Sequence, residues 1–139
     1  MRHKAFEKLL VCLPQKIDGS SKYIKEDINM LDERWVFHDD VKAEQAGEGV
    51  IRRVLAYSRD LMCVENTFET GAVGKLHHHP HTQITYVVSG VFEFEIDGEK
   101  KIVKAGDTML KLNGVEHGCV CREGGILLDI FTPMREDFV

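Results

Sequence analysis

The sequence predicts an all-β domain of the sandwich or barrel type, on two observations. From Gly49 onward, short apolar runs are interrupted every eight to twelve residues by turn residues. Helical periodicity is weak over the same part of the chain, and strict alternation of apolar and polar residues is present in it. The length of 139 residues is that of about one domain. We therefore expect one core between packed strands.

Eight segments are predicted to be strands. They are residues 50–57, 61–68, 84–88, 91–96, 100–103, 108–112, 118–121 and 126–132. Residues 1–48 carry a weaker signal and are expected to be a partly structured N-terminal extension, with a short helix at residues 5–12, that packs on the barrel or on a partner subunit. Residues 49–139 are expected to form the barrel domain.

The clearest local signal is a β-hairpin. Residues 92–96, Phe-Glu-Phe-Glu-Ile, alternate strictly and run into Asp97-Gly98, a dipeptide that favours a type I′ turn. The phenylalanines should therefore face the core, and the glutamates the solvent. Ser89-Gly90 is predicted to be a second tight connection between strands.

Charge and hydropathy exclude two classes of partner. The net charge is −5 and no predicted element gathers Lys or Arg, so we do not expect a nucleic acid partner. The longest apolar runs, residues 9–13 and 126–130, are far shorter than the roughly 20 residues that span a bilayer. The N-terminal residues contain no continuous apolar run of secretory length, so a cytoplasmic location is expected.

Four cysteines are expected to be reduced thiols. Cys12, Cys63, Cys119 and Cys121 do not form the dense framework of a disulfide-stabilised domain. Cys119 and Cys121 are two residues apart, which is not the usual spacing of a zinc or redox pair. Packing inside a strand explains them better.

Four of the seven histidines fall within residues 77–81, just before the strand that begins at Ile84. In an extended segment His77, His79 and Gln83 have the same parity and point to one side, whereas His78 points to the other. Two imidazoles two residues apart on a strand can share one metal ion. From the histidine run alone, a solvated polar loop is an equally good interpretation.

The spacing around these histidines resembles the two motifs of the cupin superfamily. Gly71, His77, His79, Gln83 and Gly90 reproduce the first motif, with glutamine in the usual glutamate position. The second motif is matched by Gly106, Leu112, Gly114 and His117, with leucine in place of proline and Cys121 where asparagine is common. The resemblance implies a conical, jelly-roll-like double-stranded β-helix. It also implies that His117 completes a site for one divalent transition metal: Mn, Fe, Co, Ni, Cu or Zn.

Glutamine in place of glutamate changes the charge of such a site. Three neutral imidazoles and an amide leave the full +2 charge of the ion to act on whatever binds in the open positions. We therefore expect an anionic ligand. The set also departs from the two-histidine, one-carboxylate triad of many iron oxygenases, which makes oxygen chemistry a weaker expectation.

The last predicted strand contains one carboxylate in an apolar run. Asp129 shares a face with Leu127 and Phe131, and an unpaired ionised group in a barrel interior costs several kcal/mol. Arg135 is the nearest cation in the sequence and the expected partner. An Asp129–Arg135 ion pair that fixes the C-terminal strand is the purely structural interpretation of the two residues.

Residues 83–90 and 128–138 resemble the KdgF proteins of pectin and alginate breakdown, and the likeness extends over about residues 49–139. This resemblance implies that the protein opens the ring of a small anionic sugar acid, a 4,5-unsaturated monouronate. Asp129 would then be the acid or base, Arg135 would bind the carboxylate, and Phe131 would form a wall against the sugar. His81 is either a second proton carrier or a histidine at the mouth of the barrel.

Two other functions stay open at this point. One is a different metal-dependent cupin enzyme, such as a dioxygenase or a sugar isomerase. The other is a small-ligand-binding module without catalysis, since a fold alone does not determine function. The resemblance also implies a homodimer, to which the N-terminal residues could contribute.

Overall fold

The computed structural model describes residues 29–139; the helix predicted at residues 5–12 and Cys12 lie outside this range. The strands are β1 (Glu44–Gly47), β2 (Val50–Tyr57), β3 (Met62–Phe68), β4 (Val73–His77), β5 (Thr82–Ile96), β6 (Glu99–Lys104), β7 (Thr108–Lys111) and β8 (His117–Thr132). Two single-turn 3-10 helices, η1 (His38–Asp40) and η2 (Glu136–Phe138), flank them. The all-β prediction is confirmed. Within the described residues, no helix is long and apolar enough to cross a membrane.

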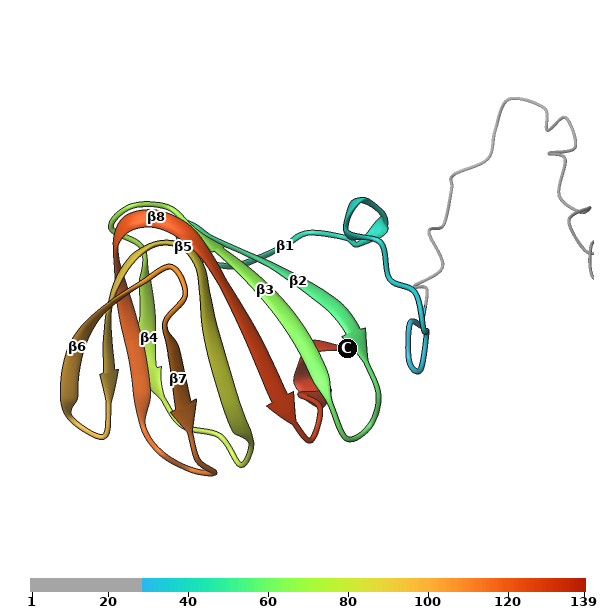
Figure 1. The fold of residues 1–139 in the computed structure, drawn as a ribbon. Helices are drawn as coiled ribbons and strands as arrows, with labels where there is room; N and C mark the ends of the chain where they lie inside the picture. Colours follow the sequence, from blue (N-terminus) through green and yellow to red (C-terminus); the bar gives the residue numbers. More distant parts are fainter. Residues whose placement is uncertain (1–28) are drawn as a thin grey trace, which may run out of the picture.

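The strands form a jelly roll of two leaves, joined by the long strands β5 and β8, which bend over the top of the molecule (Figure 1). In the first leaf, the C-terminal half of β8 lies between β3 and the N-terminal half of β5. This leaf continues through β2 to β1 on one side and to β7 on the other. In the second leaf, the N-terminal half of β8 lies between β4 and the C-terminal half of β5, whose other neighbour is β6.

The β5–β6 hairpin is as predicted. Asp97 and Gly98 both have positive φ angles, 50° and 79°, as a type I′ turn requires. Phe92 and Phe94 are buried in the core between the leaves, and Glu93 lies on the other side of the strand, where it binds Arg122.

The tight connection predicted at Ser89-Gly90 is wrong, because β5 continues through these residues. The register with β8 shifts on both sides of Ser89, so this part of β5 is bulged. Val87 faces inward before the bulge and Phe92 after it, so the inward positions change from odd to even numbers. Gly90 has a φ of 84°, and a Cβ there would lie 2.5 Å from the carbonyl oxygen of Glu123. The residues that suggested a turn therefore serve to bend a continuous strand.

Two strands, β1 and β4, were not predicted. Every residue of β1 is exposed, and β4 is exposed apart from a half-buried Gly74. Neither strand therefore has the alternation of buried apolar and exposed polar residues from which a strand is predicted. The predicted segments 118–121 and 126–132 are parts of the single strand β8. The domain boundary at residue 48 stays a prediction, although β1, which precedes it, pairs with β2.

The interior contains two apolar clusters and a buried polar set. One cluster lies between the leaves around Phe92, and the other lies around Met62 and Phe131. Cys119 belongs to the first cluster, and no disulfide forms among the described cysteines. The buried polar residues are His79, Gln83, Thr85, Lys111, His117 and Asp129. Since burying such groups is costly without partners, their arrangement indicates a functional site.

Candidate active site

Three imidazoles converge at one end of the barrel. His77 is the last residue of β4 and His117 the first of β8, and the two are register partners. His79 lies in the connection from β4 to β5, which reverses the chain at Pro80, so strand alternation is not what brings it to the site. One ligand atom from each of the three side chains lies within 4.8 Å of the others. The three histidines that the cupin motifs predicted are thus brought together.

Backbone carbonyl groups orient two of these rings. Nδ1 of His77 donates to the Lys75 carbonyl oxygen at 2.7 Å, and Nδ1 of His117 donates to that of Val115 at 2.9 Å. This arrangement leaves both Nε2 atoms without a proton and available to a metal ion, as is usual for ligating histidines. Nε2 of His117 is buried and has no partner among residues 29–139. The donor set therefore fits a divalent transition metal.

Burial favours the neutral form of the two inner imidazoles. Loss of hydration and, to a smaller extent, the positive charge of nearby Arg135 lower the pKa of His79 to about 4. Burial likewise lowers the pKa of His117 to about 4. Both rings are therefore neutral at physiological pH, the state in which an imidazole can bind a metal ion.

Gln83 connects the imidazoles with the buried carboxylate. Its Oε1 atom lies 3.1 Å from Nε2 of His79, and its Nε2 atom donates to Oδ1 of Asp129 at 2.8 Å. Because the carboxylate accepts only from the NH₂ group, it turns the amide oxygen toward the imidazoles. Asp129 thus determines which atom of Gln83 faces the histidine cluster.

The expected partnership between Asp129 and Arg135 is wrong. Asp129 accepts hydrogen bonds from Asn66 at 2.8 Å, from Thr85 and from Gln83, and Nζ of Lys111 donates to the Thr85 hydroxyl in turn. The buried carboxylate is therefore satisfied by donors on the neighbouring strands, because β8 lies between β3 and β5. Arg135 follows the strand and turns instead to Asp137, which it binds through Nε and Nη2 at 2.9 and 2.8 Å.

Arg135 and Phe131 nevertheless line the same cavity as His77, His117 and Asp129. The cavity has a volume of about 880 Å³. The Phe131 ring centroid is 5.7 Å from that of His79, and Cζ of Arg135 is 5.4 Å from the Phe131 centroid. The three residues that the KdgF resemblance marked in the C-terminal segment thus surround one space.

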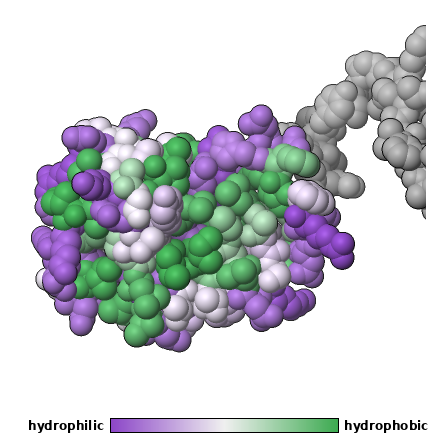
Figure 2. Space-filling model, in the orientation of Figure 1, coloured by the Kyte–Doolittle hydropathy of each residue, from purple (hydrophilic) through white to green (hydrophobic). Residues whose placement is uncertain are grey.

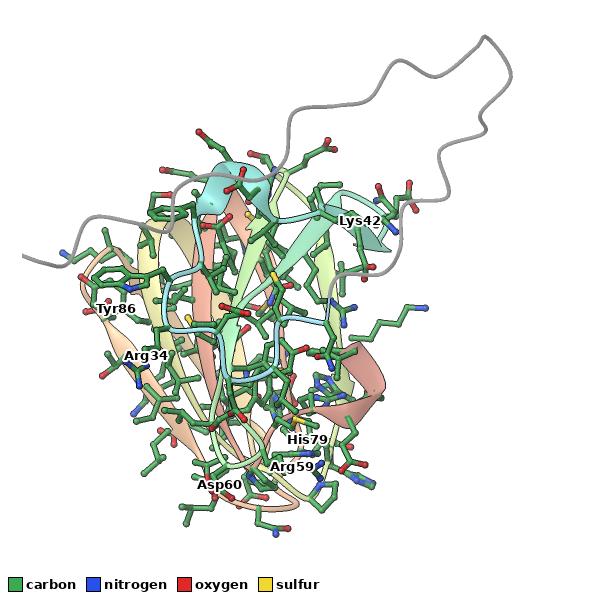
Figure 3. All side chains as sticks on the ribbon, turned by 90° about the vertical axis from the view of Figure 1, so that its right-hand side faces the viewer. Arg34, Lys42, Arg59, Asp60, His79 and Tyr86 are labelled. Carbon is green, nitrogen blue, oxygen red and sulfur yellow. The ribbon has the colours of Figure 1, made fainter. Side chains whose placement is uncertain are left out.

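The other histidines of the run separate into two kinds. His78 is exposed and is not part of the cluster. His81 is half-buried, with its ring centroid 5.2 Å from that of His79, and its Nε2 donates to the Met134 carbonyl oxygen at 3.2 Å. Figure 3 shows His79 toward the lower end of the barrel, beside the C-terminal segment. His81 therefore holds that segment next to the site.

Comparisons with known proteins agree with this geometry. The cupin domain family matches residues 64–131. The pectin degradation protein KdgF of Dickeya dadantii (strain 3937) is 42% identical over 108 residues, which are 76% of this chain and 98% of that protein. This chain belongs to the KdgF family of cupins.

Solved structures support the assignment to the KdgF family. KdgF from Halomonas sp. superposes with a TM-score of 0.73 at 36% identity, over 76% of this chain and 97% of that one. An RmlC-like cupin from Shewanella frigidimarina NCIMB 400 superposes with a TM-score of 0.77 at 41% identity, over 80% of this chain and all of that one. The cupin fold implied by the sequence motifs is therefore confirmed.

Four residues of the site were not identified from the sequence. Asn66 and Thr85 bind Asp129 directly, Lys111 lies behind Thr85, and Arg52 lines the cavity from β2. Lys111 had a detectable signal: it has the parity of buried Met109, opposite to that of exposed Leu110. Thr85 had one as well, since it has the parity of Gln83 on β5. Asn66 and Arg52 come from β3 and β2, and only the pairing of the strands brings them to the site.

Proposed function

We propose that the protein opens 4,5-unsaturated monouronates to linear 4-deoxy-5-keto uronates. The observation that carries the proposal is the buried carboxylate of Asp129, which is linked through Gln83 to the three-imidazole cluster in one cavity. The kinship with a pectin degradation protein supports the substrate class, because unsaturated uronates arise when pectin is cleaved by elimination. The cytoplasmic location expected from the sequence stays a prediction.

The reaction is an isomerisation and needs no second substrate. The bond between C1 and the ring oxygen breaks, C1 becomes an aldehyde, and the hydroxyl proton of C1 is lost. The ring oxygen keeps the electron pair of the broken bond and becomes the oxygen of an enolate at C5, and C4 then takes up one proton to give the ketone. The reaction therefore needs stabilisation of negative charge on that oxygen and a group that moves a proton.

The residues of the cavity can meet both needs. We assign His77, His79, His117 and the amide oxygen of Gln83 to one divalent transition metal. When bound, this ion supplies electrophilic stabilisation of the negative charge that develops on the sugar oxygen. Asp129 carries the proton, a role worth typically 10²- to 10⁴-fold in rate. Arg135 contributes positive charge near the substrate carboxylate, and Phe131 packs against the sugar ring.

The test is turnover of an unsaturated monouronate by purified protein. The protein is stripped of metal with a chelator and loaded in turn with Mn, Fe, Co, Ni, Cu or Zn. We expect at least one form to accelerate the loss of the near-ultraviolet absorbance of the substrate, with a C4 methylene group in the product by NMR. No acceleration by any loaded form would exclude the proposed reaction.

A variant pair tests the role of Asp129 separately. Asp129→Asn should lower kcat by about 10²- to 10⁴-fold, because the carboxamide cannot take up and release the proton. Asp107→Asn is the matched control, since Asp107 caps the Lys104 amide in a turn outside the cavity. Metal content is measured for both variants, because Asp129 also orients Gln83. Full activity in Asp129→Asn would overturn this assignment but leave the reaction itself intact.

A further inference from the structure

Arg52 brings a second guanidinium group to the cavity. It lies on β2, in register with Asn66 of β3, which is itself a donor to Asp129. Arg52 and Asn66 both line the cavity, together with Arg135. Since successive residues of a strand point to opposite faces, Arg53 points away from the cavity, where it binds Glu65 at 3.5 Å. The two neighbouring arginines therefore differ in which side of β2 they face.

Within residues 29–139, Arg52 forms no ion pair. By contrast, Arg53, Arg122 and Arg135 are paired with Glu65, Glu93 and Asp137 respectively. Arg52 is half-buried, and burial is the largest influence on its pKa and lowers it; the positive charge of Arg135 also lowers the pKa, whereas the carboxylates of Glu44, Asp137 and Asp129 raise it. Since Arg52 forms an ion pair with none of these carboxylates among the described residues, a half-buried guanidinium group beside another cation gains from an anionic ligand. The cavity is therefore electrostatically prepared for an anionic ligand.

Phe138 holds both guanidinium groups in place. Cζ of Arg52 lies 3.9 Å from the centroid of the Phe138 ring, and Cζ of Arg135 lies 4.3 Å from it. Stacking on an aromatic ring uses the flat face of a guanidinium group and leaves its N–H edge free for hydrogen bonds in the plane. The 3-10 turn η2, to which Phe138 belongs, thus positions two cations at the wall of the cavity.

The two arginines are not equally available to a ligand. Arg135 uses Nε and Nη2 for Asp137, so its most favourable bidentate edge is occupied by a carboxylate of the protein itself. Arg52 has no such partner among the described residues, so its bidentate edge stays open. Of the two, Arg52 is the better donor to an external carboxylate.

We propose that Arg52 is the residue that binds the carboxylate of the sugar acid, with Arg135 adding positive charge to the same cavity. The inference rests on the proposed function for the identity of the sugar. It adds to that function a residue that selects uronic acids over neutral sugars. Removal of a charged hydrogen-bond partner should weaken binding by roughly ten- to a hundredfold.

The test compares two probes that differ in one group. Galacturonate carries a carboxylate where galactose carries a hydroxymethyl group, and neither is a substrate of the proposed reaction. Calorimetry on the metal-loaded protein should show that wild type prefers galacturonate and that Arg52→Met loses this preference. Arg53→Met is the matched control and should retain it, because Arg53 faces away from the cavity. Arg52→Lys retains the charge but not the fork of donors, and should fall between the two.

Kinetics with the unsaturated uronate provide a second readout. Arg52→Met should raise KM by roughly ten- to a hundredfold with a smaller change in kcat, because the lost contact is present in both the ground state and the transition state. A purely structural role, in which Arg52 only fixes Phe138, would lower the melting temperature and leave the preference for galacturonate intact. That result would overturn the inference.

The outcomes separate this inference from the proposed function. If wild type binds galacturonate through Arg52 but does not convert the unsaturated uronate, the carboxylate site stands and the proposed reaction fails. If wild type converts the uronate and Arg52→Met matches it in KM and in sugar preference, the reaction stands and the role of Arg52 is refuted.

Discussion

Gln83 is the residue at which this chain departs from the usual cupin ligand set, and its surroundings explain why. Its NH₂ group donates to Oδ1 of Asp129 at 2.8 Å. A glutamate at this position would place a second carboxylate oxygen against the first, which like charge disfavours. The glutamine instead donates to Asp129 and so allows this carboxyl group to lie directly behind the imidazole cluster.

Gln83→Glu should consequently lower kcat by roughly 10²-fold or more, within the range for loss of a general acid or base. The three histidines remain, so we expect the variant to keep its metal, which elemental analysis after gel filtration can check. Gln45→Glu, on exposed β1, is the control for the change of charge. A Gln83→Glu enzyme as fast as wild type would show that Asp129 does not need the amide beside it.

Lys111 is a buried cation, only 1% exposed, and its energetics depend on pH. Burial lowers its pKa from 10.5 to about 8. Between these two values the unfolded chain binds more protons than the folded one, so the free energy of unfolding must rise with pH. Burial of the charged ammonium group costs the folded state about 3 kcal/mol below about pH 8. This cost decreases as the pH rises and is absent above about pH 10.5, where the group is neutral in both states.

Urea denaturation of wild type and Lys111→Met, in the presence of a chelator, measures this effect. We expect the stability of wild type relative to the variant to increase between about pH 8 and pH 10. Lys104→Met, at an exposed position on β6, should show no such trend relative to wild type. A difference between wild type and Lys111→Met that stays constant with pH would contradict the burial of a titrating ammonium group.

Strand β5 illustrates how far sequence patterns can predict an element. Alternation predicted its two halves, residues 84–88 and 91–96, because each half has one buried and one solvated face. It could not predict that they form one strand, because a glycine after a serine is typical of a turn as well as of a bulge. The choice depends on β8, whose carbonyl group at Glu123 approaches Gly90 too closely for any side chain.

Gly90→Ala should therefore destabilise the fold more than an alanine at another glycine with positive φ. The new Cβ would lie 2.5 Å from the Glu123 carbonyl oxygen, in addition to the strain of a φ of 84°. Gly106 has a φ of 94° with nothing within 4 Å of the added Cβ, so Gly106→Ala shows the cost of strain alone. That cost is about 1 kcal/mol, and we expect Gly90→Ala to lose at least about 3 kcal/mol in urea denaturation. Equal losses at the two positions would indicate that β5 and β8 separate easily at the bulge.

Like the fold, the candidate site could be predicted only in part from the sequence. His77, His79 and His117 lie within two short motifs, so the resemblance to the cupin motifs was enough to predict that their imidazoles cluster. The carboxylate Asp129 was predicted because a charge in an apolar strand is conspicuous. Its actual partners could not be predicted, because Asn66 and Thr85 are neighbours only through the pairing of β3, β8 and β5. Arg135 was paired wrongly with Asp129 because sequence proximity does not show on which side of a strand end the chain turns.

The outer face of the first leaf is a property of the whole molecule. Ile84 and Leu110, which are register partners on β5 and β7, are 47% and 58% exposed. Tyr86 and Val88 extend this apolar surface along β5. Figure 2 shows hydrophobic residues gathered in the middle of the face toward the viewer, and Figure 3 places Tyr86 on that side of the molecule. Contiguous apolar surface on a sheet is typical of a protein interface.

The homodimer expected from the sequence would bury this surface around a two-fold axis, so each side chain would contribute twice. Light scattering during gel filtration should give the mass of a dimer for wild type. Ile84→Lys should raise the dissociation constant by about a hundredfold or more, because two copies of an isoleucine that gives ~1.5–3 kcal/mol on burial would be lost. Ile102→Lys is the matched control: Ile102 is 61% exposed, but it lies on β6 of the second leaf. A monomeric wild type at ~100 μM, well above the dissociation constant expected for an interface of ordinary size, would contradict the dimer. Equal dissociation by both variants would instead place the interface elsewhere.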